Sequence, residues 1–182
     1  MKKAILLAAA LLALTAAKAQ LTWEARLGAV VSKFTESDTK MKLGMKAGVG
    51  AQYAVSDLVA VRPGVYFTMK GASKDDSFAI GSGDSFNLSY LEIPVLASFR
   101  FPMTENFKLA LSAGPYFGLR LNKPDGTEGL KTGDFGVNVG LDFIFGKAGK
   151  IVLGPEIEYG LTKVGADDDK NLAYMLCLGY KF

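Results

Sequence analysis

Two glutamates near the C-terminus, Glu156 and Glu158, have the residue type and spacing for acid–base chemistry. They stand two positions apart in an alternating segment, so their carboxylates face the same side of a strand. Paired carboxylates can act as general acid and general base. They can equally neutralise arginines in a protein interior, where a buried charge requires a partner. We favour this structural interpretation and expect no enzyme activity.

Other reactive groups are scarce in the chain. It has no histidine, which excludes Ser–His and Cys–His nucleophile pairs as well as imidazole metal ligands. The single cysteine, Cys177, cannot form an internal disulfide, and we interpret it as an inert side chain inside the last strand. The run Asp167–Asp169 could bind a divalent cation, but we favour the interpretation that it is a solvated loop tip. We therefore expect no cofactor and no metal.

The last segment of the chain is a strand with one apolar face. An assembly signal is predicted on that face from its alternate residues, Leu176, Leu178, Tyr180 and Phe182. A membrane barrel must show such a face to lipid, whereas the termini of soluble proteins usually fray in water. The terminal aromatic also resembles the signal by which outer-membrane assembly machinery recognises barrels, so that machinery is an expected partner during biogenesis.

The N-terminal segment has the pattern of a secretory signal peptide. Lys2 and Lys3 precede an apolar run, 4–17, and Ala17 and Ala19 are small residues at the positions that a signal peptidase reads. The alternative is a membrane anchor, but this run is shorter than the roughly 20 residues that a spanning helix needs. We expect residues 1–19 to be cleaved and residues 20–182 to form a single barrel domain.

The net charge of the mature chain argues against a nucleic-acid partner. Cleavage would remove three lysines and leave 18 basic and 18 acidic residues, so the mature chain is formally neutral. A neutral chain offers no electrostatic footprint for nucleic acid.

Apolar and polar residues alternate in many segments of the mature chain. This period of two is the signature of strands with one apolar face, and it repeats without any long apolar run. Connections after the second, fourth and sixth segments are short, and the other connections are longer and polar, as in outer-membrane barrels. The fold class predicted is an all-β, eight-stranded, antiparallel up-and-down transmembrane barrel, with strands over residues 21–33, 43–55, 58–70, 86–101, 107–121, 133–145, 151–163 and 172–182.

The polar face of these strands carries charges of both signs. An eight-stranded barrel has an interior that side chains can fill, so paired charges suit a narrow lumen. In a soluble periplasmic ligand-binding barrel, the alternative, the apolar face would instead point inward. The predicted lumenal charge network consists of Glu24, Arg26, Lys46, Arg62, Glu92, Arg100, Lys108, Arg120, Asp134, Asp142, Glu156 and Glu158.

Prolines conflict with this pattern. Proline lacks the N–H that a strand ladder needs, and a closed barrel has no free edge on which to place it. We expect β-bulges at these positions. The four prolines inside predicted strands are Pro63, Pro94, Pro115 and Pro155.

The same segments resemble the PorT family of small outer-membrane barrels. The resemblance rests on residues 61–67 (VRPGVYF), 90–94 (YLEIP), 113–116 (AGPY) and 178–182 (LGYKF), and it extends over the mature chain. The YLEIP string is the most specific of them. The chain departs from the family at Gly64, where an acidic residue is frequent. The family is named after a member linked to protein secretion across the outer membrane, and the resemblance implies an outer-membrane location and a barrel architecture more than an activity.

The functional prediction is therefore an integral protein of the Gram-negative outer membrane with a structural, surface-interaction or secretion-accessory role. The outer-membrane lipid is its expected surrounding, and a protein partner at the outer loops or in a secretion system is a further expectation. We expect a monomer. The alternative is a narrow porin-like channel for ions or small solutes, because glycines also line the polar face.

Overall fold

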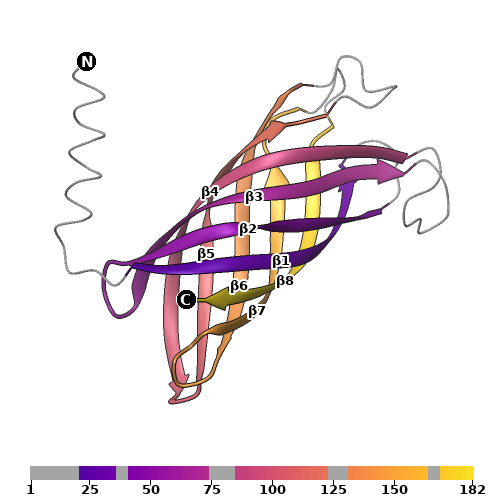
Figure 1. Cartoon of the computed structure of the whole chain (residues 1–182). Coiled ribbons are helices and arrows are strands. Elements are labelled where there is room, and N and C mark those ends of the chain that lie inside the picture. Colours follow the sequence, from indigo (N-terminus) through magenta and orange to yellow (C-terminus); the bar gives the residue numbers. More distant parts are fainter. Residues whose placement is uncertain (1–20, 36–40, 74–84, 123–130, 164–168) are drawn as a thin grey trace, which may run out of the picture.

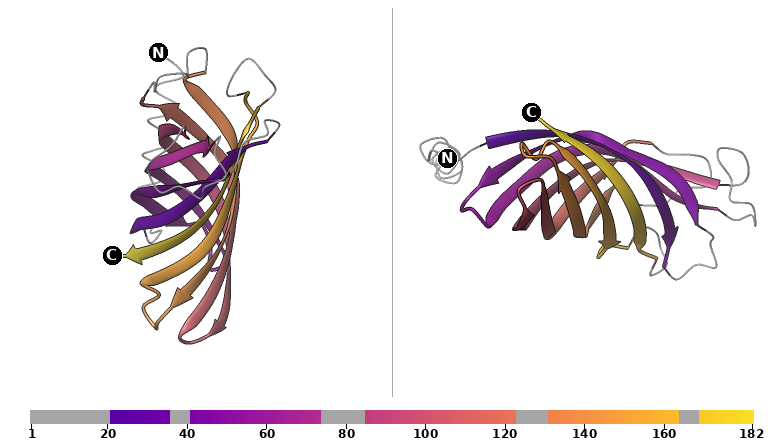
Figure 2. Two further views of the ribbon diagram at one scale, coloured as in Figure 1. Left: turned by 90° about the vertical axis from the view of Figure 1, so that its right-hand side faces the viewer. Right: turned by 90° about the horizontal axis from the view of Figure 1, so that it is seen from below.

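Eight antiparallel strands lie side by side in sequence order, and β1 pairs with β8 to close a barrel (Figure 1). This computed structural model describes residues 21–35, 41–73, 85–122, 131–163 and 169–182. The strands run obliquely around the barrel (Figure 2). They are β1 Leu21–Phe34, β2 Lys42–Ala54, β3 Val59–Ser73, β4 Ser85–Thr104, β5 Phe107–Arg120, β6 Gly133–Phe145, β7 Ile151–Gly160 and β8 Asn171–Lys181.

The predicted fold class is confirmed, and so is the alternation of short and long connections. The short turns that follow β2, β4 and β6 lie at the same end of the barrel as the start of β1 and the end of β8 (Figure 1). We call this end the turn end. In the turn between β6 and β7, Gly146 and Gly149 have φ angles of 85° and 61°, which L-residues with side chains rarely adopt. The predicted signal peptide, residues 1–19, lies outside the described residues.

Side chains alternate between the lumen and the outside along each strand. In β7, for example, Ile151, Leu153 and Ile157 are exposed, whereas Val152 and Glu156 are buried. Large apolar residues on the outer face remain about half exposed, such as Leu27 and Leu178 at 56% each. Charged residues are buried inside. This orientation is the reverse of that in a water-soluble barrel, so it contradicts the alternative of a soluble periplasmic ligand-binding barrel and agrees with the membrane barrel that we predicted.

The prolines do not form the bulges that we expected. At each of the four positions the register is the same on both sides of the proline. Pro63 illustrates the arrangement, because it stays in register with Val95 of β4 but has no pair on β2. Each proline thus interrupts pairing with the preceding strand only. Within the described strands, the register shifts only between Pro102 and Thr104, at the end of β4.

Strand β7 is three residues shorter than predicted. The N–H groups of Leu161 and Thr162 both donate to the carbonyl of Phe135, at 2.7 and 3.2 Å. The Thr162 hydroxyl in turn accepts the Phe135 N–H at 2.9 Å. Because two consecutive residues share one partner residue, the regular ladder stops at Gly160.

Apolar side chains also enter the lumen, near both of its ends. Phe34, Leu88 and Tyr90 form one buried cluster at the end opposite the turn end. A second cluster, Ala110, Ile144 and Val152, lies near the turn end. The polar residues occupy the space between them. In the described part of the chain, no helix is long and apolar enough to cross a membrane.

Candidate functional site: the charged network of the lumen

Arg26 on β1 joins three carboxylates from three strands. Its Nε donates to Oε1 of Glu24 at 2.7 Å, and its Nη2 lies 3.1 Å from Oδ1 of Asp142 on β6. Its Nη1 donates to Oε1 of Glu156 on β7. All four side chains are buried. The planar guanidinium, with five N–H donors in a fixed fork, is suited to bridging several carboxylates at once.

Lys46 on β2 forms the next link. Its Nζ lies 3.0 Å from Oε2 of Glu156 and 2.8 Å from Oε1 of Glu158, both on β7. The amide of Asn138 donates to the same Glu158 oxygen at 2.8 Å. The ring of Tyr66 lies 5.0 Å from the lysine nitrogen, within the range of a cation–π contact.

Lys70 on β3 continues the network away from the turn end. Its Nζ lies 2.5 Å from Glu92 on β4 and 2.7 Å from Glu158 on β7. The ring centroid of Tyr116 is 4.5 Å away. Lys70 is the last residue of the predicted strand 58–70 and stands on the same polar face as Arg62, but the predicted network did not include it. Counting every charge on that face would have found it.

The network ends in ion pairs near the turn end of the barrel and mainly in hydrogen bonds at the opposite end. Near the turn end, Arg62 pairs with Asp142, donates to Ser112 at 2.9 Å and lies 3.6 Å from Glu24. Lys181 lies 4.0 Å from that glutamate.

At the opposite end, Asp134 accepts hydrogen bonds from one side chain on β5, one on β8 and one just after β7. The donors are Tyr116 at 3.0 Å, Asn171 at 2.9 Å and Thr162 at 3.0 Å. Lys70 lies 4.0 Å away and connects Asp134 to the rest.

Nine of the twelve predicted charges thus lie in one buried network of ion pairs and hydrogen bonds. The other three have different surroundings. Arg120 is buried on β5, in register with Tyr90. Arg100 is half-buried and donates to the Ser56 carbonyl of a turn at 2.5 Å. Lys108 is half-buried near the turn end of β5. The nine members are Glu24, Arg26, Lys46, Arg62, Glu92, Asp134, Asp142, Glu156 and Glu158.

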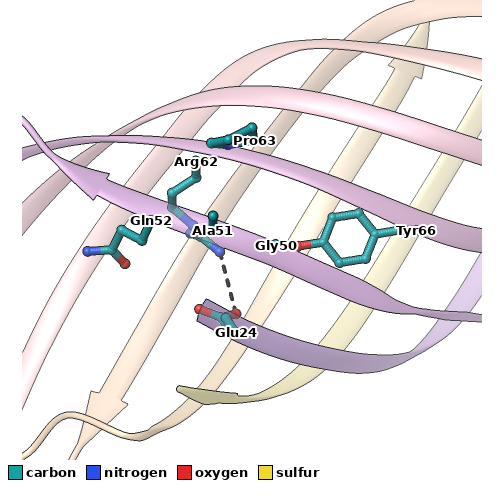
Figure 3. Close-up of a pocket in the computed structure, with 7 residues that line it drawn as sticks. All are labelled: Glu24, Gly50, Ala51, Gln52, Arg62, Pro63 and Tyr66. Atoms are coloured by element: carbon teal, nitrogen blue, oxygen red, sulfur yellow. Dashed lines mark ion pairs between the residues drawn. The ribbon is translucent and has the colours of Figure 1, made fainter. Parts of the chain in front are cut away.

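A small recess lies beside Pro63, where the β2–β3 ladder is interrupted (Figure 3). It contains about 180 Å³ of empty space, which includes space open to solvent. Glu24, Gln52 and Tyr66 line it on the lumenal side. Oε2 of Glu24 is buried and accepts no hydrogen bond from the described residues. The recess is large enough for water and too small for a substrate of ordinary size.

The remaining predicted features are easily placed. Leu176, Leu178, Tyr180 and Phe182 all face outward, with Phe182 64% exposed. Cys177 is buried on the inner face of β8. No cluster of three or more Cys, Asp or Glu side chains suited to a metal ion occurs among the described residues. Of the run Asp167–Asp169, only Asp169 is described.

Comparisons with known proteins agree with this architecture. Neisserial surface protein A is 16% identical, with 90% of this chain and 99% of that chain covered and a TM-score of 0.60. The outer membrane protein OprG of Pseudomonas aeruginosa is 15% identical over 91% of this chain and 97% of that chain, with a TM-score of 0.55. Ail of Yersinia pestis, in complex with the heparin analogue sucrose octasulfate, is 18% identical over 90% and 99%, with a TM-score of 0.50.

At these identities the solved structures establish the fold alone. No curated protein matches the chain. The family model "Outer membrane protein beta-barrel domain" matches residues 4–182. The chain therefore belongs to the outer membrane protein β-barrel domain family, as a small barrel whose interior is packed with buried salt bridges.

Proposed function

We propose that this barrel is a non-conducting, non-enzymatic protein of the Gram-negative outer membrane, with a structural or surface-interaction role. The observation that carries the proposal is the continuous lumenal network from Asp134 to Lys181. Its members bond to one another, so few charges remain for a passing ion. A channel needs sites that bind an ion weakly enough for it to leave, and side chains already held in ion pairs do not supply such sites.

Apolar side chains add to the barrier. Leu88 and Tyr90 at one end, and Ile144 and Val152 at the other, are almost fully buried. Apolar side chains that narrow a lumen can exclude ions, because water leaves such places readily. The proposed role therefore belongs to the outside of the barrel, at the outer loops, where a protein partner could bind.

Recordings from purified monomer in planar lipid bilayers test this proposal. We expect no ion flux above that of protein-free bilayers. Stable, frequent channel openings would contradict it. Incorporation must be verified on the same preparation by a heat-dependent shift of the folded band on a denaturing gel.

A narrow porin-like channel is the second candidate. The recess beside Pro63 favours it, because Glu24, Gln52 and Tyr66 offer polar atoms to water within the wall near the turn end. In that case Arg62→Gln would change the size or ion selectivity of openings already present in the wild type. Openings that appear only in the variant would instead indicate that the ion pairs normally block the lumen.

A secretion-accessory role in the PorT family is a more specific proposal. It is supported by the YLEIP string at residues 90–94 and by the other segments that resemble the family. Fold-level likeness does not carry a function by itself. Crosslinking in intact cells followed by affinity purification tests it. Recovery of no component of a secretion system, from cells in which one is active, would count against the proposal.

Export by a cleaved signal peptide is also proposed, on the pattern of residues 1–19. The intact mass of protein isolated from outer membranes tests it. We expect a chain that begins at Gln20, and a chain that retains Met1 would contradict the proposal.

A further inference from the structure

Strand β8 closes the barrel, yet the middle of its inner face carries no charge. From Asn171 to Lys181, the buried inner residues between the two ends are Ala173, Met175, Cys177 and Gly179. Its neighbours differ, since β1 contributes Glu24 and Arg26 and β7 contributes Glu156 and Glu158. The closing strand therefore offers no ionic partner of its own along most of its length.

The ion pairs pass over this strand. Arg26 of β1 reaches Glu156 of β7, and Lys46 of β2 reaches both Glu156 and Glu158. Beneath these ion pairs, Cys177 of β8 is in register with Gly28 of β1 on one side and with Gly154 of β7 on the other. A Cβ atom on Gly28 would lie 2.6 Å from the sulfur of Cys177, so there is no space for a larger side chain at Gly28 unless the cysteine moves.

An apolar patch lies where β1 pairs with β8, a contact that we call the β1–β8 seam. Val30 of β1 packs with Ala173, Met175 and Cys177 of β8, and all four are buried. The main-chain ladder between β1 and β8 is continuous from Glu24–Lys181 to Phe34–Asn171. The seam is thus held by a ladder, by an apolar patch and by charges that connect the strands on either side of β8.

We propose that Arg26 and Lys46, with Glu156 and Glu158, form a clasp that holds the β1–β8 seam closed from inside the lumen. The clasp links the first two strands to the seventh, so opening the seam separates buried opposite charges. Breaking a buried ion pair by removing one partner is far more costly than its surface equivalent. The inference depends on these contacts and not on whether the barrel conducts.

Cys177 is a built-in reporter for this clasp, because it is the only cysteine and is buried at the seam. The experiment measures the rate at which a maleimide labels the folded, detergent-solubilised protein. We expect Arg26→Gln to label about tenfold faster than the wild type or more. Loss of a nearby positive charge does not favour the thiolate that maleimide requires, so faster labelling would report opening.

Glu92→Gln is the matched control. Glu92 is equally buried, but its bonds go to Lys70 and Thr68 of the neighbouring strand β3, away from the seam. We expect its labelling rate to stay close to that of the wild type. Equal rates in Arg26→Gln and the wild type would overturn the proposal. So would an equal increase in both variants, because any lost lumenal charge would then loosen the barrel.

An engineered disulfide between β1 and β8 tests the proposal if Arg26→Gln does not fold. Gly28→Cys would place a second thiol opposite Cys177, where a disulfide can bridge β1 and β8. If the clasp acts by closing the seam, the oxidised Arg26→Gln, Gly28→Cys variant should recover the folded band, and reduction should abolish it. Failure of the oxidised variant to fold, while Gly28→Cys alone folds, would overturn the proposal.

Discussion

The Nζ atom of Lys46 lies 2.8 Å from Oε1 of Glu158, and this contact joins β2 to β7 across the lumen. The two residues are 112 positions apart in the sequence, and each is only 1% exposed. Main-chain ladders connect only neighbouring strands of a barrel. Ion pairs of this kind are therefore the contacts that tie its opposite walls together.

Removal of the Lys46 charge should destabilise the barrel strongly. Lys46→Met leaves Glu156 and Glu158 with one fewer cation in a buried setting, so we expect a loss of about 3–5 kcal/mol in the free energy of unfolding. Urea unfolding in lipid vesicles, followed by circular dichroism, measures it. Lys147→Met, in an exposed turn, is the control and should change stability by less than about 0.5 kcal/mol. Equal stability of the two variants would mean that the lumenal pairs contribute little.

The arrangement of strands could be predicted from the sequence because one physical rule governs every segment. A wall that separates lipid from a polar lumen must alternate, and alternation identified all eight strands with their faces. Strand ends were less accurate, since they depend on local bonds such as those between Thr162 and Phe135. The prolines were misjudged, because bulges are the usual remedy for a missing donor, whereas here one ladder is simply interrupted beside each ring.

The partners within the lumen could not be predicted in the same way. Alternation places a charge inside, but which acid meets which base depends on the tilt and stagger of the closed barrel. Arg26 therefore meets Asp142 and Glu156 rather than a charge on an adjacent strand. Val152, an apolar residue inside the lumen, was also missed, because its segment was read only for the glycines and glutamates on the inner face.

Glycine at position 48 should be required by the close approach of Val65 and Tyr66 of β3. A Cβ atom there would lie 2.2 Å from the carbonyl oxygen of Val65 and 2.7 Å from both Cα and Cδ1 of Tyr66. Because this contact includes the backbone of β3, we expect Gly48→Ala to cost about 1–3 kcal/mol.

Gly133→Ala is the matched control for that substitution. A Cβ atom at Gly133 would have no neighbour closer than 3.8 Å, so stability should be unchanged or raised by up to about 1 kcal/mol. The same urea titration compares both variants. A loss for Gly133→Ala as large as that for Gly48→Ala would show that the close approach of Val65 and Tyr66 is not the cause.

Phe182 should matter for assembly in cells more than for folding in detergent. Phe182 faces outward, so Phe182→Ala removes no lumenal contact. We expect it to lower the amount of folded protein in isolated outer membranes, while refolding in detergent stays normal. Phe101→Ala, another exposed aromatic at the turn end, is the control and should leave the amount unchanged. Wild-type levels of the Phe182 variant would exclude this residue from the assembly signal.

The central claim is that apolar side chains face lipid while charged ones pair inside. Nitroxide labels placed one at a time along β7, in a Cys177→Ser background, test it most directly. Labels at Ile151, Leu153 and Ile157 should be reached by oxygen dissolved in lipid and shielded from a water-soluble nickel chelate. A label at Val152 should be shielded from oxygen. Oxygen accessibility that alternates in the opposite phase, or that does not alternate at all, would contradict the account.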